Sequence, residues 1–323
     1  MDKRDLRIVF MGTPDFAVES LKALVENGYN VVGVITMPDK ASGRGHKIQY
    51  SAVKEYALTQ NLPLLQPEKL KEESFLSDLK DLNADLQIVV AFRMLPEVVW
   101  DMPRLGTFNL HASLLPQYRG AAPINWAIIN GEKETGATTF FLTHEIDTGK
   151  IILQKKIPIG DEDNAGVIHD KLMVLGAEMV CETVDMLLDE KVDAIDQSRF
   201  FADETELKSA PKIFKETCRI DWSKPVKNIH NLVRGMSPYP AAWTELYMPG
   251  KDPQMVKIYV SEIVDRLPQK TIGTILTDNK SCLDVVCADG TIRIKDIQFP
   301  GKRAMKAEEL LRGYKIEEGA RFE

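Results

Sequence analysis

The N-terminal segment reads Leu6-Arg7-Ile8-Val9-Phe10-Met11-Gly12-Thr13-Pro14, an almost continuous apolar run that ends in turn residues. Such a run predicts a strand that is buried on both faces, as the central strands of parallel sheets are. The spacing of apolar residues between positions 18 and 25 predicts a helix that ends near Gly28. Residues 30–36 and 85–92 predict two further strands. Strand, helix and strand in this order indicate a parallel sheet with crossover helices.

The pattern changes near residue 190, and the chain is predicted to hold two domains. Residues 165–189 are predicted to form a long helix that closes an α/β domain over residues 1–189. Residues 190–209 are polar, show no clear period, and are interpreted as a linker. Residues 210–323 are predicted to form a small antiparallel barrel or sheet. Its predicted elements are a helix over 226–234 and strands over 243–248, 256–264, 273–277, 282–287 and 291–299, the last two joined by a hairpin at Asp289-Gly290.

Composition excludes several classes of protein. The 323 residues are 44% apolar and 28% charged, which is typical of a soluble globular protein. No apolar run approaches the ~20 residues that span a bilayer, and the N-terminus does not resemble a secretory signal. The four cysteines show neither CxxC nor paired metal-ligand spacing. Secreted, membrane, fibrous and disulfide-scaffold proteins are therefore excluded, and we expect a cytoplasmic protein with reduced thiols.

The net charge of −7 argues against a nucleic-acid coat protein, but this charge is unevenly divided. Residues 1–204 hold 21 Lys and Arg against 32 Asp and Glu, whereas residues 205–323 hold 20 against 16. An acidic half joined to a mildly basic half is compatible with nucleic-acid or membrane contact by the basic half. Lysines that are only solvated would give the same excess of positive charge. Contact with a nucleic acid or membrane and a simply solvated surface therefore both stay open.

The turn after the first strand lacks a nucleotide-binding motif. Gly12-Thr13-Pro14-Asp15-Phe16 does not match GxGxxG, and no GxxxxGK[ST] occurs in the chain. A nicotinamide-dependent oxidoreductase is therefore disfavoured. A metal site lacks support because the five histidines show neither HxxxH nor HxH spacing. A Ser-His-Asp hydrolase lacks support because Ser113 is not in a GxSxG elbow.

The segment from Thr107 to Pro123 carries the most informative polar residues. Asn109 and His111 stand two apart at the end of a predicted strand, so both side chains point to one face. In open α/β sheets, ligands bind at the carboxyl ends of the strands. An amide beside an imidazole suits the stabilisation of an oxyanion while a proton moves. A histidine that caps a turn would give the same local pattern.

Asp147 is a candidate partner for His111. It lies in the stretch His144-Glu145-Ile146-Asp147-Thr148-Gly149, between two apolar, Thr-rich runs. Its carboxylate would orient the imidazole and favour the imidazolium form. An aspartate that only shapes a hairpin is the alternative, and sequence spacing does not decide between them.

Residues 38–48 form a second candidate site. The segment is too long and too rich in glycine and cations for a simple strand-to-helix turn. Arg44, between two glycines, can approach a polyanion closely, and Lys40, His46 and Lys47 add positive charge. A plain polar surface loop would have a similar composition.

Several motifs, in the same order, resemble the folate-dependent formyltransferase family. The pattern Asn109-x-His111-x-Ser113-Leu114-Leu115-Pro116-x-Tyr118-Arg119-Gly120, followed by Asp147-Thr148-Gly149, is similar to its signature. Four further motifs resemble those of the methionyl-tRNA formyltransferase branch of this family. They are Gly12-Thr13-Pro14-Asp15-Phe16, Gly43-Arg44-Gly45, Arg219-Ile220-Asp221-Trp222 and Pro238-Tyr239-Pro240. The resemblance covers nearly the whole chain. It departs at Phe92-Arg93-Met94-Leu95-Pro96, where Arg93 stands in place of a common glycine.

The resemblance implies a Rossmann-like N-terminal domain followed by an OB-like barrel that binds tRNA. The implied reaction transfers a formyl group from 10-formyltetrahydrofolate to the α-amino group of methionyl initiator tRNA, with no metal. By motif, Asn109, His111 and Asp147 would be catalytic, and Arg44 would lie in a loop that meets the tRNA acceptor end. The residues that would line the folate site are Ser113, Leu114, Leu115 and Pro116.

Four lysines are further candidates for contact with tRNA phosphates. Lys47 belongs to the same loop as Arg44, and Lys208, Lys212 and Lys215 cluster in sequence where the predicted linker meets the second domain. The alternatives to a tRNA enzyme are a formyltransferase that acts on a sugar-nucleotide amine and a catalytically inactive folate- or RNA-binding module. We expect a monomer with no membrane partner.

Overall fold

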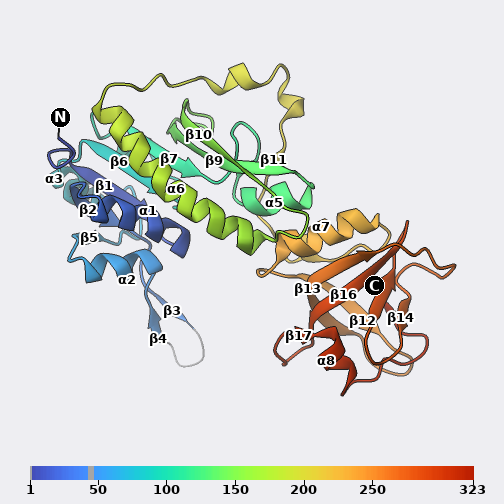
Figure 1. The fold of residues 1–323 in the computed structure, drawn as a ribbon. Helices are drawn as coiled ribbons and strands as arrows, with labels where there is room; N and C mark the ends of the chain where they lie inside the picture. The colour runs from blue at the N-terminus through green and yellow to red at the C-terminus, as the bar shows by residue number, and fades with distance from the viewer. Residues whose placement is uncertain (1, 43–46) are drawn as a thin grey trace. The chain divides into compact units, whose positions relative to one another are not determined.

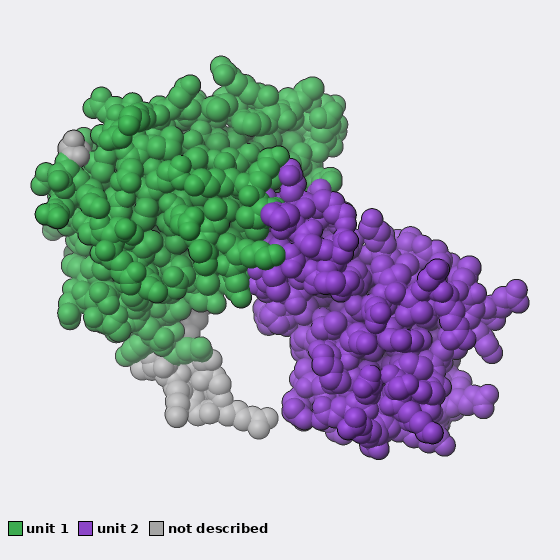
Figure 2. Space-filling view, in the orientation of Figure 1, with its two compact units in different colours: residues 1–120, 136–157, 169–209 green, residues 121–135, 158–168, 210–323 purple. Residues whose placement is uncertain are grey.

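A computed structural model describes residues 2–42 and 47–323 of the chain. The chain divides into two compact units, which Figure 2 shows in two colours. Unit 1 comprises residues 1–120, 136–157 and 169–209, and unit 2 comprises residues 121–135, 158–168 and 210–323. Each unit has its own large sheet and its own hydrophobic core.

Unit 1 is built on a seven-stranded sheet in the order β10-β9-β7-β6-β1-β2-β5 (Figure 1). Strands β5, β2, β1, β6 and β7 run parallel, and β9 runs antiparallel to β7. This arrangement confirms the predicted Rossmann-like parallel sheet. The strands are β1 (Ile8–Gly12), β2 (Val31–Ile35), β5 (Leu64–Leu65), β6 (Leu86–Val90), β7 (Thr107–His111), β9 (Glu134–Phe141) and β10 (Ile151–Pro158).

Helices cover both faces of this sheet, which explains why β1 and β6 are fully buried. Leu79 of α3 and Val99 of α4 pack with Val89 of β6 on one face. On the other face, Leu110 of β7 lies against Gly176 of α6, where an added Cβ would come within 2.6 Å of Leu110 Cδ2. The helices of unit 1 are α1 (Asp15–Glu26), α2 (Ala52–Thr59), α3 (Glu73–Asp81), α4 (Glu97–Trp100) and, from residue 169 onward, α6 (Ala165–Leu188).

Unit 2 contains a nearly closed antiparallel barrel, as predicted. Its strand order is β14-β15-β16-β13-β12-β18, with β17 paired to β16. A backbone bridge between Thr274 and Arg321 joins the two edges of the sheet. The strands are β12 (Ala242–Tyr247), β13 (Gln254–Val264), β14 (Ile275–Thr277), β15 (Leu283–Val286), β16 (Thr291–Gln298), β17 (Met305–Lys306) and β18 (Arg321–Phe322).

The helices of unit 2 pack against this barrel and against one another. Ile229 and Val233 of α7 enter the barrel core, beside Trp222. Gly235 of α7 leaves room for the side chain of Ile129 on α5. This packing gives a physical reason why residues 121–135 group with unit 2 rather than with the sheet of unit 1. The helices are α5 (Pro123–Ile129), α7 (Val226–Met236) and α8 (Ala307–Leu311).

Four short strands lie outside the two large sheets. They form two-stranded pairs, β3 with β4 and β8 with β11. Their bounds are β3 (Lys40–Ser42), β4 (Lys47–Gln49), β8 (Arg119–Gly120) and β11 (Ser209–Ala210).

Residues 190–209, which the sequence suggested were a linker, are bound to the sheet of unit 1 over part of their length. Ile195 exchanges two backbone hydrogen bonds with Ile151 of β10, both 2.8 Å long. Gln197 begins a short 3-10 helix, Gln197–Phe200, and is buried. A polar segment without a period therefore contributes a buried side chain to unit 1.

Candidate active site

Strand β7 places Asn109 and His111 on the face of the sheet that α6 does not cover. Asn109 is the register partner of Val89 on β6 and of Phe140 on β9, whereas Leu110, one residue on, faces α6. Successive side chains of a strand alternate between faces. The structure therefore confirms that Asn109 and His111 share one face at the carboxyl end of a parallel strand, where open α/β sheets bind their ligands.

His111 is held by two neighbours. Its imidazole is 7% exposed, and its Nε2 lies 2.8 Å from the backbone oxygen of Tyr118. Because a carbonyl oxygen only accepts, Nε2 carries a hydrogen and donates it. The other ring nitrogen, Nδ1, lies 3.8 Å from Oδ2 of Asp147. That separation is an ion-pair distance, longer than a hydrogen bond, so the Tyr118 carbonyl fixes the ring while the carboxylate faces Nδ1.

Asp147 lies in a tight bend between β9 and β10. Its backbone is in the left-handed region, with φ of 56°, and its Oδ2 accepts the N–H of Gly120 at 2.9 Å. Gly149 lies so close to the backbone of Phe141 that an added Cβ would be 2.8 Å from the Phe141 carbonyl carbon. Asp147 therefore forms the bend and also presents a carboxylate to His111, whereas the ring is held by the Tyr118 carbonyl.

The amide of Asn109 is available to a ligand. The side chain is half-buried on β7, and no hydrogen bond joins it to any residue within 2–42 and 47–323. An amide nitrogen in this position can donate to an oxygen atom that is placed beside His111. The three groups thus supply a neutral donor, an imidazole and a carboxylate around one end of β7.

The segment Ser113–Pro116 is held largely from within. Ser113 is fully buried, and its hydroxyl donates to the carbonyl of Gln117 at 2.7 Å. Leu115 is also buried and packs with Phe140 and Ile151. Leu114 is only half-buried, so it is the member of the four predicted folate residues with the most exposed side chain. These contacts show that Ser113 and Leu115 shape the loop, and they leave Leu114 as its most accessible side chain.

The structure describes the predicted tRNA-binding residues to different extents. Arg44 lies outside the described residues, and of Lys47 only the backbone, at the start of β4, is described. Lys208 is exposed in unit 1, and its backbone oxygen accepts the N–H of Tyr118 at 2.6 Å. Lys212 and Lys215 are exposed in unit 2, where their ammonium groups lie over Phe214 and Trp243.

Gln197 and Arg93 make contacts that the sequence did not predict. Gln197 donates to the carbonyls of Asp147 and Gly149, and it lies in a segment whose composition gave no sign of this role. Arg93, noted as a departure from the family pattern, donates to the carbonyls of Glu68 and Pro67. Its guanidinium thus joins the loop after β6 to the loop after β5, a contact that a glycine at this position would not make.

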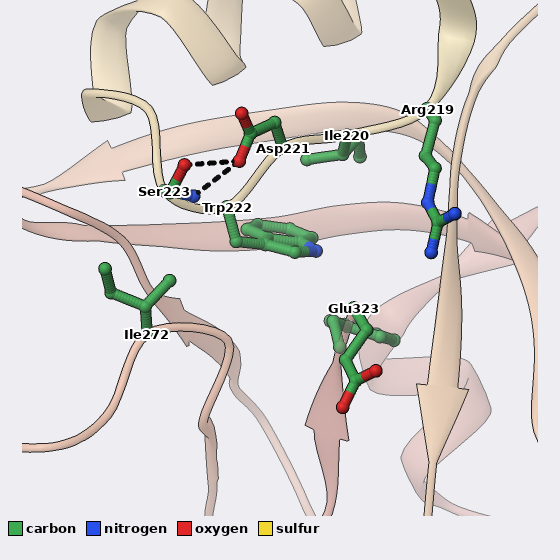
Figure 3. Close-up of a pocket in the computed structure, with 8 residues that line it drawn as sticks. Arg219, Ile220, Asp221, Trp222, Ser223, Ile272 and Glu323 are labelled. Atoms are coloured by element: carbon green, nitrogen blue, oxygen red, sulfur yellow. Dashed lines mark hydrogen bonds between the residues drawn. The ribbon is translucent and has the colours of Figure 1, made fainter. Parts of the chain in front are cut away.

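Unit 2 has a surface pocket of about 460 Å³ beside the Arg219-Ile220-Asp221-Trp222 motif (Figure 3). In Figure 3 the Asp221 carboxylate accepts the backbone N–H and the hydroxyl of Ser223, at 3.0 and 2.5 Å. Arg219 pairs with Glu245 at 3.1 Å. The Trp222 ring stacks on Phe322. The charged groups of this motif are therefore engaged in structural contacts, and unit 1 is the better candidate for chemistry.

Neither a metal cluster nor a membrane-spanning helix is found in the part of the chain that the structure describes. No three His, Cys, Asp or Glu side chains within residues 2–42 and 47–323 are grouped so as to hold a metal ion. Over the same residues, no helix combines the length and apolar character needed to cross a bilayer.

Two family models match the chain. The model described as "Formyl transferase" matches residues 6–184, and "Formyl transferase, C-terminal domain" matches residues 212–315. The first match contains Asn109, His111 and Asp147, and the second contains the barrel of unit 2 up to α8.

Curated relatives match over nearly their whole length. The chain is 64% identical to the methionyl-tRNA formyltransferase of Parabacteroides distasonis, with 98% of each chain covered. It is 63% identical to that of Bacteroides thetaiotaomicron, with 99% of each chain covered. It is 51% identical to that of Porphyromonas gingivalis, with 98% of each chain covered.

Solved structures share the fold at lower identity. The sugar 3N-formyl transferase WlaRD superposes with a TM-score of 0.64 at 19% identity, over 92% of this chain and 99% of that chain. HypX from Aquifex aeolicus, in complex with tetrahydrofolic acid, superposes with a TM-score of 0.63 at 20% identity, over 97% of this chain and 48% of that chain. At these identities the likeness concerns the fold.

Proposed function

The chain belongs to the methionyl-tRNA formyltransferases, and from that membership we propose that Asn109, His111 and Asp147 catalyse transfer of a formyl group from a folate to the amino group of methionyl-tRNA. The observation that carries the assignment of roles is the geometry at the end of β7, where Asn109 and His111 share one face and Asp147 Oδ2 lies 3.8 Å from His111 Nδ1. The donor is a folate-type formyl compound, specifically 10-formyltetrahydrofolate. The acceptor is methionyl initiator tRNA.

The reaction exchanges one carbon–nitrogen bond for another. The neutral amine of methionine attacks the formyl carbon, and negative charge develops on the formyl oxygen in a tetrahedral intermediate. The bond from this carbon to the folate nitrogen then breaks. One proton leaves the amine nitrogen and one proton reaches the folate nitrogen, so the exchange involves no net oxidation or reduction.

Asn109 and His111 stabilise the developing oxyanion. The Asn109 amide has no protein partner among the described residues, so it can donate to the formyl oxygen without breaking a bond in the protein. His111 is nearly buried, and a hydrogen bond near the edge of a low-dielectric site is worth more than one in water. Removal of one donor from an oxyanion site typically costs about 10²–10³ in rate.

Asp147 places a carboxylate beside Nδ1 of His111. Nε2 already donates to the Tyr118 carbonyl, so any further proton on the ring resides on Nδ1, which faces the carboxylate. The carboxylate keeps its place through the Gly120 N–H rather than through the ring. Nδ1, which is 3.8 Å from the carboxylate and so not hydrogen-bonded to it, is therefore the ring nitrogen through which His111 acts on the reacting groups.

The segment Ser113–Pro116 provides one wall of the folate site. This segment follows His111 closely in the chain. Its shape is held by the hydrogen bond from the Ser113 hydroxyl to the Gln117 carbonyl and by the packing of Leu115 against Phe140. Leu114 then offers the half-exposed apolar side chain that an aromatic folate ring can contact. Support for a folate ligand also comes from HypX, which has the same fold and binds tetrahydrofolic acid.

We expect the exposed Lys212 and Lys215 of unit 2 to bind tRNA phosphates. Changing both to glutamate should weaken tRNA binding and lower the slope of log affinity against log salt by about 1–2, because each neutralised phosphate releases counterions. Filter binding or fluorescence titration at several salt concentrations measures both quantities. The matched control changes Lys280 and Lys302, two exposed lysines in other turns of unit 2, to glutamate. The site would be rejected if the Lys212 and Lys215 variant bound tRNA as tightly as the wild type, or if the control variant lost as much affinity for tRNA.

The preference for initiator tRNA is tested by comparing two acceptors that carry the same methionine. With 10-formyltetrahydrofolate as donor, methionyl initiator tRNA should be formylated with a much higher kcat/KM than methionyl elongator tRNA. Equal rates would show that the enzyme recognises the methionyl end alone. We place the reaction in the cytoplasm and expect the active species to be a monomer, which sedimentation with activity measurement tests.

A further inference from the structure

We propose that Gln197 is a positioning residue for the active site, because its amide holds the bend that carries Asp147. The inference rests on the proposed catalytic role of Asp147. Gln197 belongs to a polar segment far along the chain from the motifs of the site, and it acts through Asp147 rather than on the reacting groups.

The side-chain amide of Gln197 is fully used. The residue is 1% exposed. Its Nε2 donates to the carbonyl of Asp147 at 2.9 Å and to the carbonyl of Gly149 at 2.8 Å. Its Oε1 accepts from Nε and Nη2 of Arg119 at 3.1 and 2.6 Å. A side chain that binds two carbonyls and one guanidinium must donate two hydrogen bonds and also accept. A primary amide can do both, whereas a carboxylate or a thioether has no hydrogen to donate.

These bonds connect the two segments that set the position of the Asp147 carboxylate. The bend is held through the carbonyls of Asp147 and Gly149, on either side of Thr148. Arg119 immediately precedes Gly120, whose N–H donates to Asp147 Oδ2 at 2.9 Å. Gln197 therefore fixes the backbone that carries the carboxylate and also the strand that binds it, so it controls the separation of Asp147 from His111.

The backbone around Gln197 is itself anchored. Ile195 pairs with Ile151 at the start of β10, immediately after the bend, and Asp196 accepts the N–H of Ser198 at 2.9 Å to cap the short helix. The left-handed φ of 56° at Asp147 is a conformation that aspartate adopts more readily than most residues but less readily than glycine, so it gains from stabilisation by its surroundings. The two hydrogen bonds from Gln197 supply part of that stabilisation.

The test compares Gln197→Met with Gln197→Glu. Methionine keeps the volume and removes every hydrogen bond, whereas glutamate keeps the contact with Arg119 and removes both donations to the bend. Both variants should lower kcat by about 10–100-fold, the cost of moving a catalytic group by about 1 Å, with KM for the folate and for tRNA changed less than about threefold. Wild-type kcat in Gln197→Glu would overturn the proposal even if Gln197→Met fails to fold.

The matched control is Gln87→Met. Gln87 is a buried glutamine of β6 in the same unit, bonded to Thr107 rather than to the bend. It should keep wild-type kcat. A comparable fall in kcat for Gln87→Met would show that any buried glutamine of this unit affects the rate through general packing, which contradicts a specific role for Gln197.

A double-mutant cycle with Asp147→Asn separates this inference from the proposed function. If Gln197 acts through Asp147, the double variant should be little worse than Asp147→Asn alone in single-turnover formyl transfer. If the two substitutions lowered the rate by factors that multiply in the double variant, the positioning role of Gln197 would be overturned. Wild-type activity of Asp147→Asn would instead refute the catalytic role of Asp147, whatever Gln197→Met does.

Discussion

Replacing His111 with alanine removes formyl transfer while both substrates still bind. The rate should fall at least about 100-fold, because the variant loses both a donor to the oxyanion and the group that moves the proton. Binding should persist because the imidazole is 7% exposed and presents little surface to either substrate. Single-turnover formylation measures the rate, and equilibrium titration with folate and with methionyl-tRNA measures the binding.

The matched control for this prediction is His169→Ala. His169 is a partly exposed histidine of α6, next to Asp170 and Phe16. Loss of an imidazole from this position should leave kcat unchanged. Near-wild-type turnover in His111→Ala would contradict the assignment of His111. Equal loss in both variants would show that the effect does not depend on the position of the imidazole.

Replacing Gly149 with alanine should disrupt the bend that carries Asp147. The added Cβ would overlap the carbonyl group of Phe141, lying 2.8 Å from its carbon, and the obstacle is backbone rather than a side chain that can move aside. Relief of this overlap requires the bend to shift, so we expect a destabilisation of about 3 kcal/mol and a fall in kcat of about 100-fold or more. Denaturant unfolding and single-turnover assays measure the two effects.

Gly28→Ala provides the comparison for Gly149→Ala. Gly28 follows α1 with φ of 74°, and apart from its own chain neighbours no atom of the described residues lies within 4 Å of the place that an added Cβ would take. Its substitution should cost about 1 kcal/mol through backbone strain alone and leave kcat unchanged. Wild-type stability and kcat in Gly149→Ala would show that the bend tolerates a side chain and that its geometry does not depend on Gly149.

The parts of the fold that follow from periodic patterns could be predicted. The apolar runs of β1 and β6 and the two-residue spacing of Asn109 and His111 are local signals, and each has one structural consequence. The hairpin predicted at Asp289-Gly290 likewise forms between β15 and β16, although Cys287 donates its N–H to the Gly290 carbonyl and Ala288-Asp289 are therefore the central residues of the turn. In all these cases the interactions that matter lie within a few residues of the pattern.

The contacts that hold the active site could not be predicted, because they join irregular segments far apart in the chain. The ring of His111 is fixed by a backbone carbonyl, that of Tyr118, and a carbonyl carries no residue-specific signal. Gln197 is fifty residues from Asp147. Its segment is polar throughout, and nothing in its composition distinguishes the one buried amide from exposed neighbours.

The segment Ser113–Pro116 shows a different limit of prediction from the sequence. Its resemblance to a folate-binding segment identifies where the loop is, but outside regular structure no period indicates which side chains face a ligand. Ser113 and Leu115 are directed into the protein, toward Gln117 and Phe140. Their proposed contribution to folate binding is therefore through the shape of the loop.

This active site should formylate the amine of methionyl-tRNA rather than that of a sugar nucleotide. The most direct measurement supplies one labelled 10-formyltetrahydrofolate to methionyl initiator tRNA and an amino-sugar nucleotide at equal concentration. The wild-type protein should place the label on methionine and none on the sugar, and Asp147→Asn should label neither at a comparable rate. Label on the sugar nucleotide alone would contradict the proposed function.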